Sequence, residues 1–296
     1  MMEHLSPAQA GRCALAFVTG AGGPAGRATA SFLRERKVPV AVADMRPLEG
    51  EADLVLLPAA VAPEFRSQLR RALGERGARL LVPTVSEELP LVALDRETLR
   101  AAGCAVFISP PGATRIANDK WLTAEALARA GVGVPRSVGG GSRADILEAL
   151  SFPILSKPRQ GRGGRGIEIY ETKADLPEPS PDRIYQQFLE GEEYDVNLFA
   201  EPGGHPAALV VLRKTQLRGG RVGNATAVER DAAPDVAEVA AAASRALALE
   251  GPIDIDVRRD ARGRPLVLEV NARVGANVRA ADEVLEALLD RWKEEV

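Results

Sequence analysis

The chain has 296 residues, 46% of them hydrophobic, and its 38 Lys and Arg against 41 Asp and Glu give a formal net charge of -3. This near balance argues against a general polyanion binder, so we expect no nucleic-acid partner. The sequence holds no run of about 18 apolar residues, and we expect neither a membrane span nor a targeting segment. Two cysteines without a close sequence partner, Cys13 and Cys104, favour a reducing cytoplasm.

The first third of the chain alternates between strand and helix patterns. Residues 13–45 read as a strand, a glycine turn, a helix and a second strand, in the order CALAFVTG, AGGPAG, RATASFLRERK and VPVAVADM. The alternation continues through DLVLLP, PEFRSQLRRALGERG, ARLLVPT and CAVFISP. This order predicts a doubly wound α/β domain with a parallel sheet over residues 1–113.

The first glycine turn, TGAGGPAG, allows two interpretations. Gly20, Gly22 and Ala25 fit the spacing G-x-G-x-x-A, and Asp44 ends the second strand, where a ribose-binding acid would lie. The alternative is structural, because any tight strand-to-helix turn favours glycine. An NAD(P)-linked oxidoreductase that uses this turn therefore stays open as a rival function.

The middle of the chain begins with a helix, NDKWLTAEALARAGV. Asn118 or Asp119 is its expected N-cap, and Gly131 is expected just past its end. Two strands, FPILSKP and GIEIYE, then flank a glycine-rich loop. Three further extended segments follow (IYQQFLEG, EEYDVNLFAEP and HPAALVVLRKTQ), and PDVAEVAAAASRALALEG is an alanine-rich helix that we expect to end at Gly251.

The glycine-rich loop, SKPRQGRGGRG (156–166), joins a lysine to four glycines. Lys157 ends an apolar strand just before a proline, so its ammonium group extends from a rigid base. A fixed cation beside backbone N–H groups suits the phosphates of a nucleotide. The alternatives are a solubilising surface hairpin and, less favourably in an acidic chain, an RGG-type nucleic-acid segment. The glycines are Gly161, Gly163, Gly164 and Gly166.

An acidic hairpin lies near the end of the chain, in PIDIDVRR and RPLVLEVNAR. Alternate residues of a strand share a face, so a four-residue turn at 261–264 would place Asp256 opposite Glu269 and Asp254 opposite Asn271. The other face would carry a core side made of Ile253, Ile255, Val257, Leu266, Leu268 and Val270. Such an oxygen-rich patch suits Mg²⁺, which takes phosphates as further ligands. A solvated face of an amphipathic hairpin is the alternative.

Taken together, these segments resemble the ATP-grasp superfamily, especially the carbamoyl-phosphate-synthetase-like carboxylate-amine ligases. The resemblance rests on the order of NDKWLTAEALARAGVGVP, FPILSKPRQGRGGRGI, QQFLEGEEYDV, GPIDIDV and LEVNARVGANV, and extends to VTGAGGPAGRATASFL and PTVSEELP. It implies an α/β protein: a doubly wound pre-ATP-grasp domain (1–113), then a two-subdomain ATP-grasp α+β module. The two subdomains would be a lid (114–185) and a metal-binding part (186–296).

The resemblance also implies roles for individual residues. Lys120 and Lys157 match the lysines that contact ATP phosphates, and the four loop glycines match the loop that closes over the triphosphate. Glu193 matches the acid that binds the ribose, and the adenine hinge would be formed by Gln187, Phe188 and Leu189. Ligands for two Mg²⁺ ions would be Asp256, Glu269 and Asn271, with Mn²⁺ as an alternative metal. Arg273 matches the arginine near the transferred phosphate, and Arg213 or Lys214 would reach the same centre.

Two positions depart from the pattern of the family. Asp256 stands where many relatives have glutamine, and Ser156 stands where an apolar residue is usual. The implied activity is an ADP-forming ligation of a carboxylate, from an amino acid or peptide, with an amine. A non-catalytic ATP-binding regulator is the remaining rival. The resemblance also implies a homodimer, and we place the substrate pocket around 86–88 and 275–279.

Overall fold

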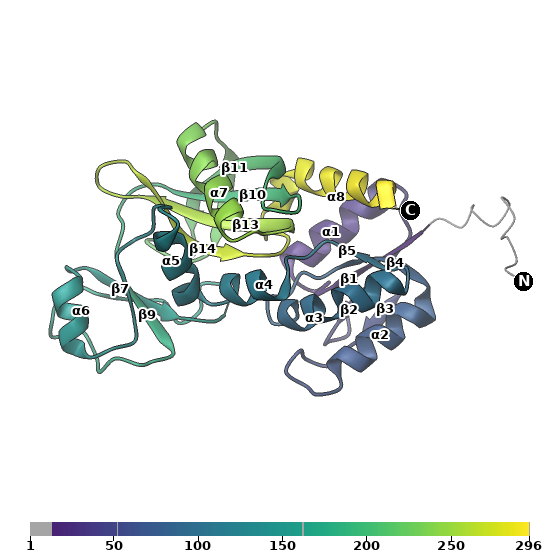
Figure 1. The fold of residues 1–296 in the computed structure, drawn as a ribbon, viewed down its shortest axis with the longest axis horizontal. Helices are drawn as coiled ribbons and strands as arrows, with labels where there is room; N and C mark the ends of the chain where they lie inside the picture. Colours follow the sequence, from purple (N-terminus) through teal and green to yellow (C-terminus); the bar gives the residue numbers. More distant parts are fainter. Residues whose placement is uncertain (1–13, 52, 162, 296) are drawn as a thin grey trace, which may run out of the picture.

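A computed structural model describes residues 14–51, 53–161 and 163–295. Cys13 lies outside these ranges. Figure 1 shows three groups of elements: one that contains β1 to β5, one that contains α6, β7 and β9, and one that contains β10, β11 and β13. Each group is built on its own sheet, and the three sheets have five, four and five strands.

The first sheet is parallel and has the order β3-β2-β1-β4-β5 among the described residues. Because the strand order reverses at β1, the sheet is doubly wound, as the alternation in the sequence predicted. Its elements are β1 (Leu15–Thr19), α1 (Pro24–Glu35), β2 (Val40–Asp44), β3 (Leu54–Leu56), α2 (Phe65–Arg76), β4 (Ala78–Val82), α3 (Leu89–Ala101) and β5 (Ala105–Val106).

Two short helices lead from this sheet to a small antiparallel sheet with the order β6-β9-β7-β8. Asp119 caps the second helix, since its carboxylate accepts hydrogen bonds from the N–H groups of Trp121 and Leu122, which confirms one of the two predicted caps. The elements are α4 (Pro111–Ala117), α5 (Lys120–Arg129), β6 (Ser137–Gly139), α6 (Arg143–Ala149), β7 (Ile154–Pro158), β8 (Glu168–Tyr170) and β9 (Arg183–Gln187).

The third sheet is antiparallel, in the order β12-β11-β10-β13-β14. Helices α7 and α8 both contact it, and α8 also contacts α1 of the first sheet's group. The elements are β10 (Glu193–Ala200), β11 (Pro206–Leu217), β12 (Ala225–Arg230), α7 (Pro234–Ala246), β13 (Gly251–Arg259), β14 (Pro265–Asn271), η2 (Val278–Ala280) and α8 (Asp282–Glu295).

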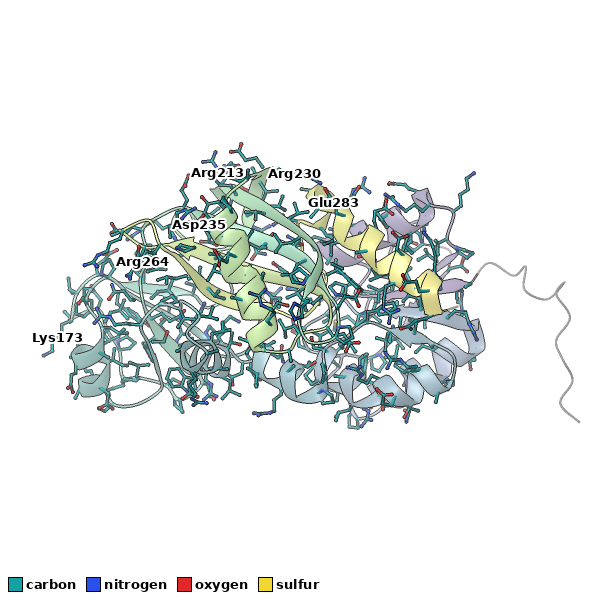
Figure 2. The ribbon with its side chains drawn as sticks, turned by 45° about the horizontal axis from the view of Figure 1, so that its top comes forward. Lys173, Arg213, Arg230, Asp235, Arg264 and Glu283 are labelled. Atoms are coloured by element: carbon teal, nitrogen blue, oxygen red, sulfur yellow. The ribbon has the colours of Figure 1, made fainter. Side chains whose placement is uncertain are left out.

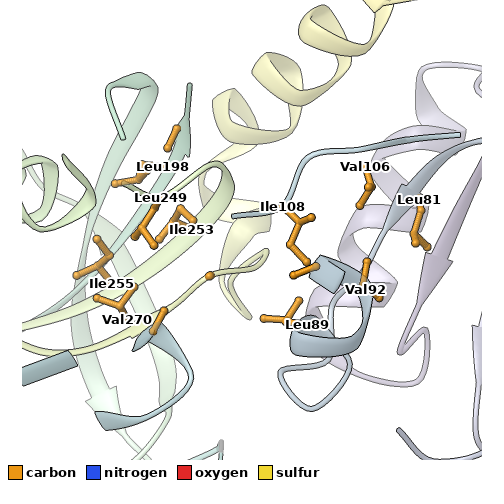
Figure 3. Packing of buried hydrophobic residues seen from close by; sticks show 14 of the residues in the cluster. Leu81, Leu89, Val92, Val106, Ile108, Leu198, Leu249, Ile253, Ile255 and Val270 are labelled. Carbon is orange, nitrogen blue, oxygen red and sulfur yellow. The ribbon is translucent and has the colours of Figure 1, made fainter. Parts of the chain in front are cut away.

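The first and third sheets share their hydrophobic cores. One cluster joins Leu81, Val92 and Ile108 to Ile253 and Val270, and Figure 3 shows the two sides of this contact. The alanine-rich helix was predicted to end at Gly251, but α7 ends at Ala246 and Gly251 opens β13. A Cβ atom at Gly251 would overlap the carbonyl oxygen of Phe107, so the glycine serves the contact between the two groups.

The predicted domain boundaries stay predictions. The boundary after residue 113 falls inside α4, and the boundary after residue 185 falls inside β9. Both positions therefore divide an element of regular structure. No helix of the described residues is long and apolar enough to cross a membrane.

Candidate functional site

A cleft with about 790 Å³ of empty space, including open solvent, lies between the four-stranded sheet and the third sheet. Its lining contains eleven of the residues predicted from the sequence: Lys120, Lys157, Gly161, Gly164, Gln187, Phe188, Leu189, Glu193, Lys214, Asp256 and Glu269. Leu155, Ile167 and Leu268 add apolar surface to the lining. A mostly apolar pocket with a few converging charged groups is the common form of a ligand site.

Two lysines converge on one carboxylate in this cleft. The Nζ atom of Lys120 lies 3.4 Å from Oε2 of Glu269, and Nζ of Lys157 lies 3.8 Å from the same oxygen. Lys120 also donates to the carbonyl of Gly161 at 2.9 Å, and Lys157 donates to the carbonyl of Leu268 at 3.0 Å. The helix start at α5, the strand β7 and the hairpin strand β14 thus meet at one point.

The glycine-rich loop between β7 and β8 needs its glycines. Gly161, Gly163, Gly164 and Gly166 all have positive φ, between 67° and 125°, where other residues are strained. A Cβ atom at Gly164 would lie 3.0 Å from Cα of Gly223, so the loop lies against the connection between β11 and β12. The loop therefore forms one wall of the cleft and does not project as a free hairpin.

The predicted register of the acidic hairpin is confirmed. Asp254 pairs with Asn271 and Asp256 pairs with Glu269 across β13 and β14. The predicted turn is wrong, however, because Arg259 pairs with Pro265 and the connection has five residues, 260–264. A bulge at Leu268 absorbs the difference.

The bulge also corrects the predicted core side. Val267 pairs with Val257 and is buried in the hydrophobic core, in the place predicted for Leu268. Leu268 instead lines the cleft, and its carbonyl accepts the hydrogen bond from Lys157. Leu266 is only half-buried. The extra residue thus adds an apolar side chain and an acceptor to the site.

Strand β10 adds a third column of polar side chains beside the hairpin. Asp195 pairs with Asp256 and Asn197 pairs with Asp254 across β10 and β13. Together with the hairpin register, this gives two rows on one face of the sheet, Asp195–Asp256–Glu269 and Asn197–Asp254–Asn271. We call these six side chains the polar grid. The alternation of polar and apolar residues in EEYDVNLF could have revealed its β10 column, but the sequence analysis did not use it.

Buried charges in the grid perturb one another. Burial acts to raise the pKa of Glu269, but Lys120, Lys157 and Lys214 outweigh it and hold the pKa at about 2. Burial lowers the pKa of Lys157. Burial also raises the pKa of Asp254 well above its usual range, with Asp195 acting in the same direction. Clusters of perturbed groups in a cleft mark a candidate functional site.

We expect Asp256→Asn to remove a pH-dependent loss of stability from the metal-free protein. Burial raises the pKa of Asp256 to about 7, against the opposing effect of Lys214. In the unfolded chain the same carboxyl group has a pKa of about 3.9. Between pH ~3.9 and about 7 the folded state therefore binds more protons than the unfolded state. The free energy of unfolding then falls as the pH rises through this range. Between these limits the wild type should lose on the order of a few kcal/mol more than the variant.

Urea unfolding in EDTA at a series of pH values measures this difference. Lys214 keeps its contact with Glu193 at 2.7 Å in the variant, so the substitution does not leave that lysine unpaired. Equal slopes of stability against pH in the two proteins would contradict the shift.

Arg213 or Lys214 was predicted near the catalytic centre, and the structure contradicts this for Arg213. Its side chain pairs with Glu192, Glu229 and Asp231, and Figure 2 shows it at the outer edge of the molecule. Alternation along β11 turns its neighbour Lys214 to the opposite face, where Lys214 contacts Asp256 and Glu193. Lys214 therefore replaces Arg213 as the cation from this strand.

Arg273 connects the polar grid to the first sheet's group. Its guanidinium donates to Ser86 Oγ at 3.1 Å, to Asn271 Oδ1 at 3.3 Å and to Asp254 Oδ2 at 3.5 Å. Ser86 belongs to one of the two segments in which we expected the substrate pocket, and Arg273 lies two residues before the other. The contact places the end of β14 against the residues that follow β4.

The adenine hinge fits only in part. The N–H groups of Gln187 and Phe188 donate to the carbonyls of Arg136 and Pro153, so these two amides are not available to a base. Glu193 accepts from Lys214 at 2.7 Å and from Arg258 at 3.3 Å. Four other predicted site residues are outside the lining of the cleft in the described part of the chain: Gly163, Gly166, Asn271 and Arg273.

The first glycine turn uses its candidate ribose acid for its own structure. The N–H group of Gly22 donates to Asp44 Oδ2 at 2.8 Å. A Cβ atom at Gly26 would overlap the carbonyl of Gly20, so close packing accounts for that glycine. These contacts favour the structural interpretation of the turn over dinucleotide binding.

The unusual serine before Lys157 also has a structural partner, because Ser156 Oγ accepts a hydrogen bond from Arg183 Nε at 2.6 Å.

Comparisons with known proteins agree with this geometry. A D-alanine–D-alanine ligase from Gloeobacter violaceus is 29% identical over 58% of this chain and 63% of its own length. The carbamoyl phosphate synthase large chain of Mycobacterium tuberculosis is 26% identical over 46% of this chain and 13% of its own. The chain thus spans less than two thirds of each of these relatives.

A solved structure of similar fold is the L-amino acid ligase from Bacillus licheniformis. It superposes with a TM-score of 0.68 at 19% identity, over 91% of this chain and 69% of that one. The model of the ATP-grasp domain family matches residues 117–277, more than half of the sequence. This chain belongs to the ATP-grasp family.

Proposed function

We propose that the protein is an ATP-dependent ligase that joins a carboxylate to an amine and releases ADP and phosphate. The observation that carries this proposal is the convergence of Lys120 and Lys157 on Glu269, beside Asp256, in one partly apolar cleft. Two cations and a pair of carboxylates at one end of an apolar pocket suit a nucleoside triphosphate with its metal ions.

The cleft residues divide between the two ends of a nucleotide. Leu155, Phe188, Leu189 and Leu268 would enclose the base. The two lysines and the N–H groups of the glycine-rich loop would meet the phosphates. Glu193 would bind the ribose only by adding to, or replacing, its present bonds with Lys214 and Arg258.

The donor set fits Mg²⁺. Asp256, Glu269 and Asn271 present carboxylate and amide oxygens from adjacent positions of β13 and β14. Bound Mg²⁺ would offset the charge of the phosphates, and Mn²⁺ takes similar ligands.

The proposed chemistry has two steps. An oxygen of the carboxylate substrate attacks the γ-phosphorus of ATP, and the bond to the ADP oxygen breaks, which gives an acyl phosphate and ADP. The amine then attacks the acyl carbon, phosphate leaves with the electron pair of the broken C–O bond, and the amine loses a proton to solvent. Lys157, Arg273 and the loop amides would stabilise the charge that moves in both steps.

An amino-acid or peptide carboxylate is the proposed substrate class. The support is that relatives and structural neighbours include a D-alanine–D-alanine ligase and an L-amino acid ligase. The proposed pocket lies where Arg273 contacts Ser86, beyond the phosphate end of the cleft.

A screen of paired carboxylates and amines for ADP release tests the proposal, followed by the mass of each product. We expect release to require Mg²⁺ and both substrates, and the product mass to equal the sum of the two minus water. Binding of ATP without release for any pair would favour a regulator, and binding of NADH in its place would favour an oxidoreductase.

Lys157→Met should weaken ATP binding. The ammonium group of Lys157 is almost fully buried and points at the proposed phosphate site, so its loss removes a charge that little solvent screens. We expect the Kd for an ATP analogue to rise about 10- to 100-fold, equivalent to about 1.4 to 2.7 kcal/mol.

Titration calorimetry measures this effect, with Lys173→Met as the matched control. Lys173 is exposed at the far end of the molecule in Figure 2, and its loss should leave the Kd unchanged. An unchanged Kd in the Lys157 variant would remove this lysine from the phosphate site.

A further inference from the structure

A second group of carboxylates lies on the β10 side of the polar grid. One oxygen from each of Asp195, Asp254 and Asp256 lies within 4.8 Å of the other two. A cation such as Ca²⁺ or Mn²⁺ holds oxygen ligands at roughly 2.1–2.6 Å, so two ligands of one ion can be as far apart as about 5 Å. The three side chains can therefore share one divalent ion without a change of fold.

Two buried oxygens beside these carboxylates have no hydrogen-bond partner among the described residues. They are Oδ1 of Asn197, which is 0% exposed, and Oδ1 of Asp254, which is 7% exposed. A Cβ atom at Gly275 would overlap Asn197 Oδ1 and lie 3.1 Å from Asp254 Cγ, so both groups pack closely against the same glycine. A buried acceptor without a partner is unfavourable, and a cation within reach of both oxygens would remove that cost.

The existing contacts orient Asp195 without neutralising it. Its Oδ1 accepts from Asn197 Nδ2 at 2.8 Å, and its Oδ2 accepts from Asn277 Nδ2 at 2.6 Å. Neutral amides of this kind fix the direction of a carboxylate and leave lone pairs for a metal. The amide oxygen of Asn197 takes no part in the bond to Asp195 and lies against Gly275.

The nearby cations do not balance the charge of the group. Lys214 contacts Asp256 but also contacts Glu193, and Arg273 reaches Asp254 only at 3.5 Å. The described residues include no ion pair for Asp195. Burying like charges this close together is unfavourable unless protons or a cation compensate them.

We propose that Asp195, Asp254 and Asp256, with the amide oxygen of Asn197, form a divalent-cation site separate from the proposed Mg²⁺ site of Asp256, Glu269 and Asn271. All four ligands come from the protein, so this site should fill without nucleotide. Oxygen donors select Mg²⁺, Mn²⁺ or Ca²⁺. Asp256 belongs to both sites, so the ion would hold this carboxylate in position for the metals that arrive with ATP.

A small ion fits this place better than the ammonium group of a substrate. Asp256 lines the cleft, but Asp195 and Asn197 lie behind it and, in the described part of the chain, are not in its lining. Both are almost fully buried, so a substrate would have to displace Gly275 and Asn277, which contact them, to reach them.

Mn²⁺ binding to the full chain without nucleotide tests the proposal, read by electron paramagnetic resonance of free Mn²⁺. We expect one ion per chain at millimolar Mn²⁺ or below. Asp195→Asn and Asp254→Asn should each weaken this binding by about tenfold or more. Glu269→Gln is the matched control, since it should keep this ion and lose only the Mn²⁺ that appears when an ATP analogue is added.

Several results would overturn the assignment. The first is that the nucleotide-free wild type binds no Mn²⁺ at millimolar concentration. The second is that both aspartate variants bind Mn²⁺ with wild-type affinity, and the third is that Glu269→Gln loses the ion. The wild-type stoichiometry decides the matter even if the aspartate variants fail to fold, which circular dichroism would show. The readout needs no turnover, so failure of this proposal and failure of the ligase proposal are distinguishable.

Discussion

Glu269→Gln is expected to reduce ADP release by about 10²- to 10³-fold while the chain still folds. Glu269 is the carboxylate on which Lys120 and Lys157 converge, and β-pairing places it beside Asp256. Glutamine keeps the size of the side chain but removes the charge that would hold a metal ion against the phosphates. Both lysines retain acceptors, the carbonyls of Gly161 and Leu268, so the substitution does not isolate them.

The kcat for ADP release at saturating ATP and Mg²⁺ measures this effect, and gel filtration and circular dichroism check the fold at the assay temperature. Glu229→Gln is the matched control. Glu229 is exposed on β12 and pairs with Arg213 on the outer face, so its loss should leave kcat unchanged. Wild-type release from the Glu269 variant would exclude the acidic hairpin as the metal site.

The register of the acidic hairpin could be predicted because strand geometry constrains it strongly. A slip of one residue would turn every apolar side chain of β13 to the polar face, so the alternation in PIDIDVRR fixes which residues share a face. The pairing of Asp254 with Asn271 then followed from a short connection. The bulge at Leu268 could not be predicted. A four-residue turn without a bulge and a five-residue connection with a bulge both pair Asp256 with Glu269 and Asp254 with Asn271.

The choice between Arg213 and Lys214 shows a second limit. Both are long cations in one strand, and only the pairing of β11 with β10 decides which of them faces the grid. That pairing joins segments whose connection, 201–205, contains two glycines and leaves the register open to a sequence argument. The sequence analysis missed Asp195 and Asn197 for a similar reason. Their place in the polar grid depends on the pairing of β10 with β13, which the sequence does not show.

The contact between the first and third sheets' groups was also beyond the sequence. Each group has the alternation of an independent domain, yet Leu81 and Ile253 belong to one core, and Gly251 packs on Phe107. Such a shared core holds Ser86 against Arg273, which positions the proposed substrate pocket beside the polar grid. The first group therefore contributes to the proposed pocket through packing.

Arg273→Lys is expected to lower kcat by about 10³-fold and to change the Kd for an ATP analogue by no more than a few-fold. The guanidinium of Arg273 reaches Ser86, Asn271 and Asp254 at once, in a planar arrangement that a lysine ammonium cannot reproduce. Its place beyond Asn271, outside the lining of the cleft as described, is where the transferred phosphate and the acyl group would lie. The residue should therefore act on the transition state more than on bound ATP.

Calorimetry with the analogue and steady-state ADP release separate these two quantities. Arg230→Lys is the matched control, because Arg230 is exposed, pairs with Glu283, shown beside it in Figure 2, and does not line the cleft. If kcat fell and the Kd rose by the same factor, Arg273 would be a nucleotide-binding residue and the transferred phosphate would have to lie nearer the lysines. If neither kcat nor the Kd changed, Arg273 would take no part in the reaction. The substrate pocket would then have to lie elsewhere along the cleft.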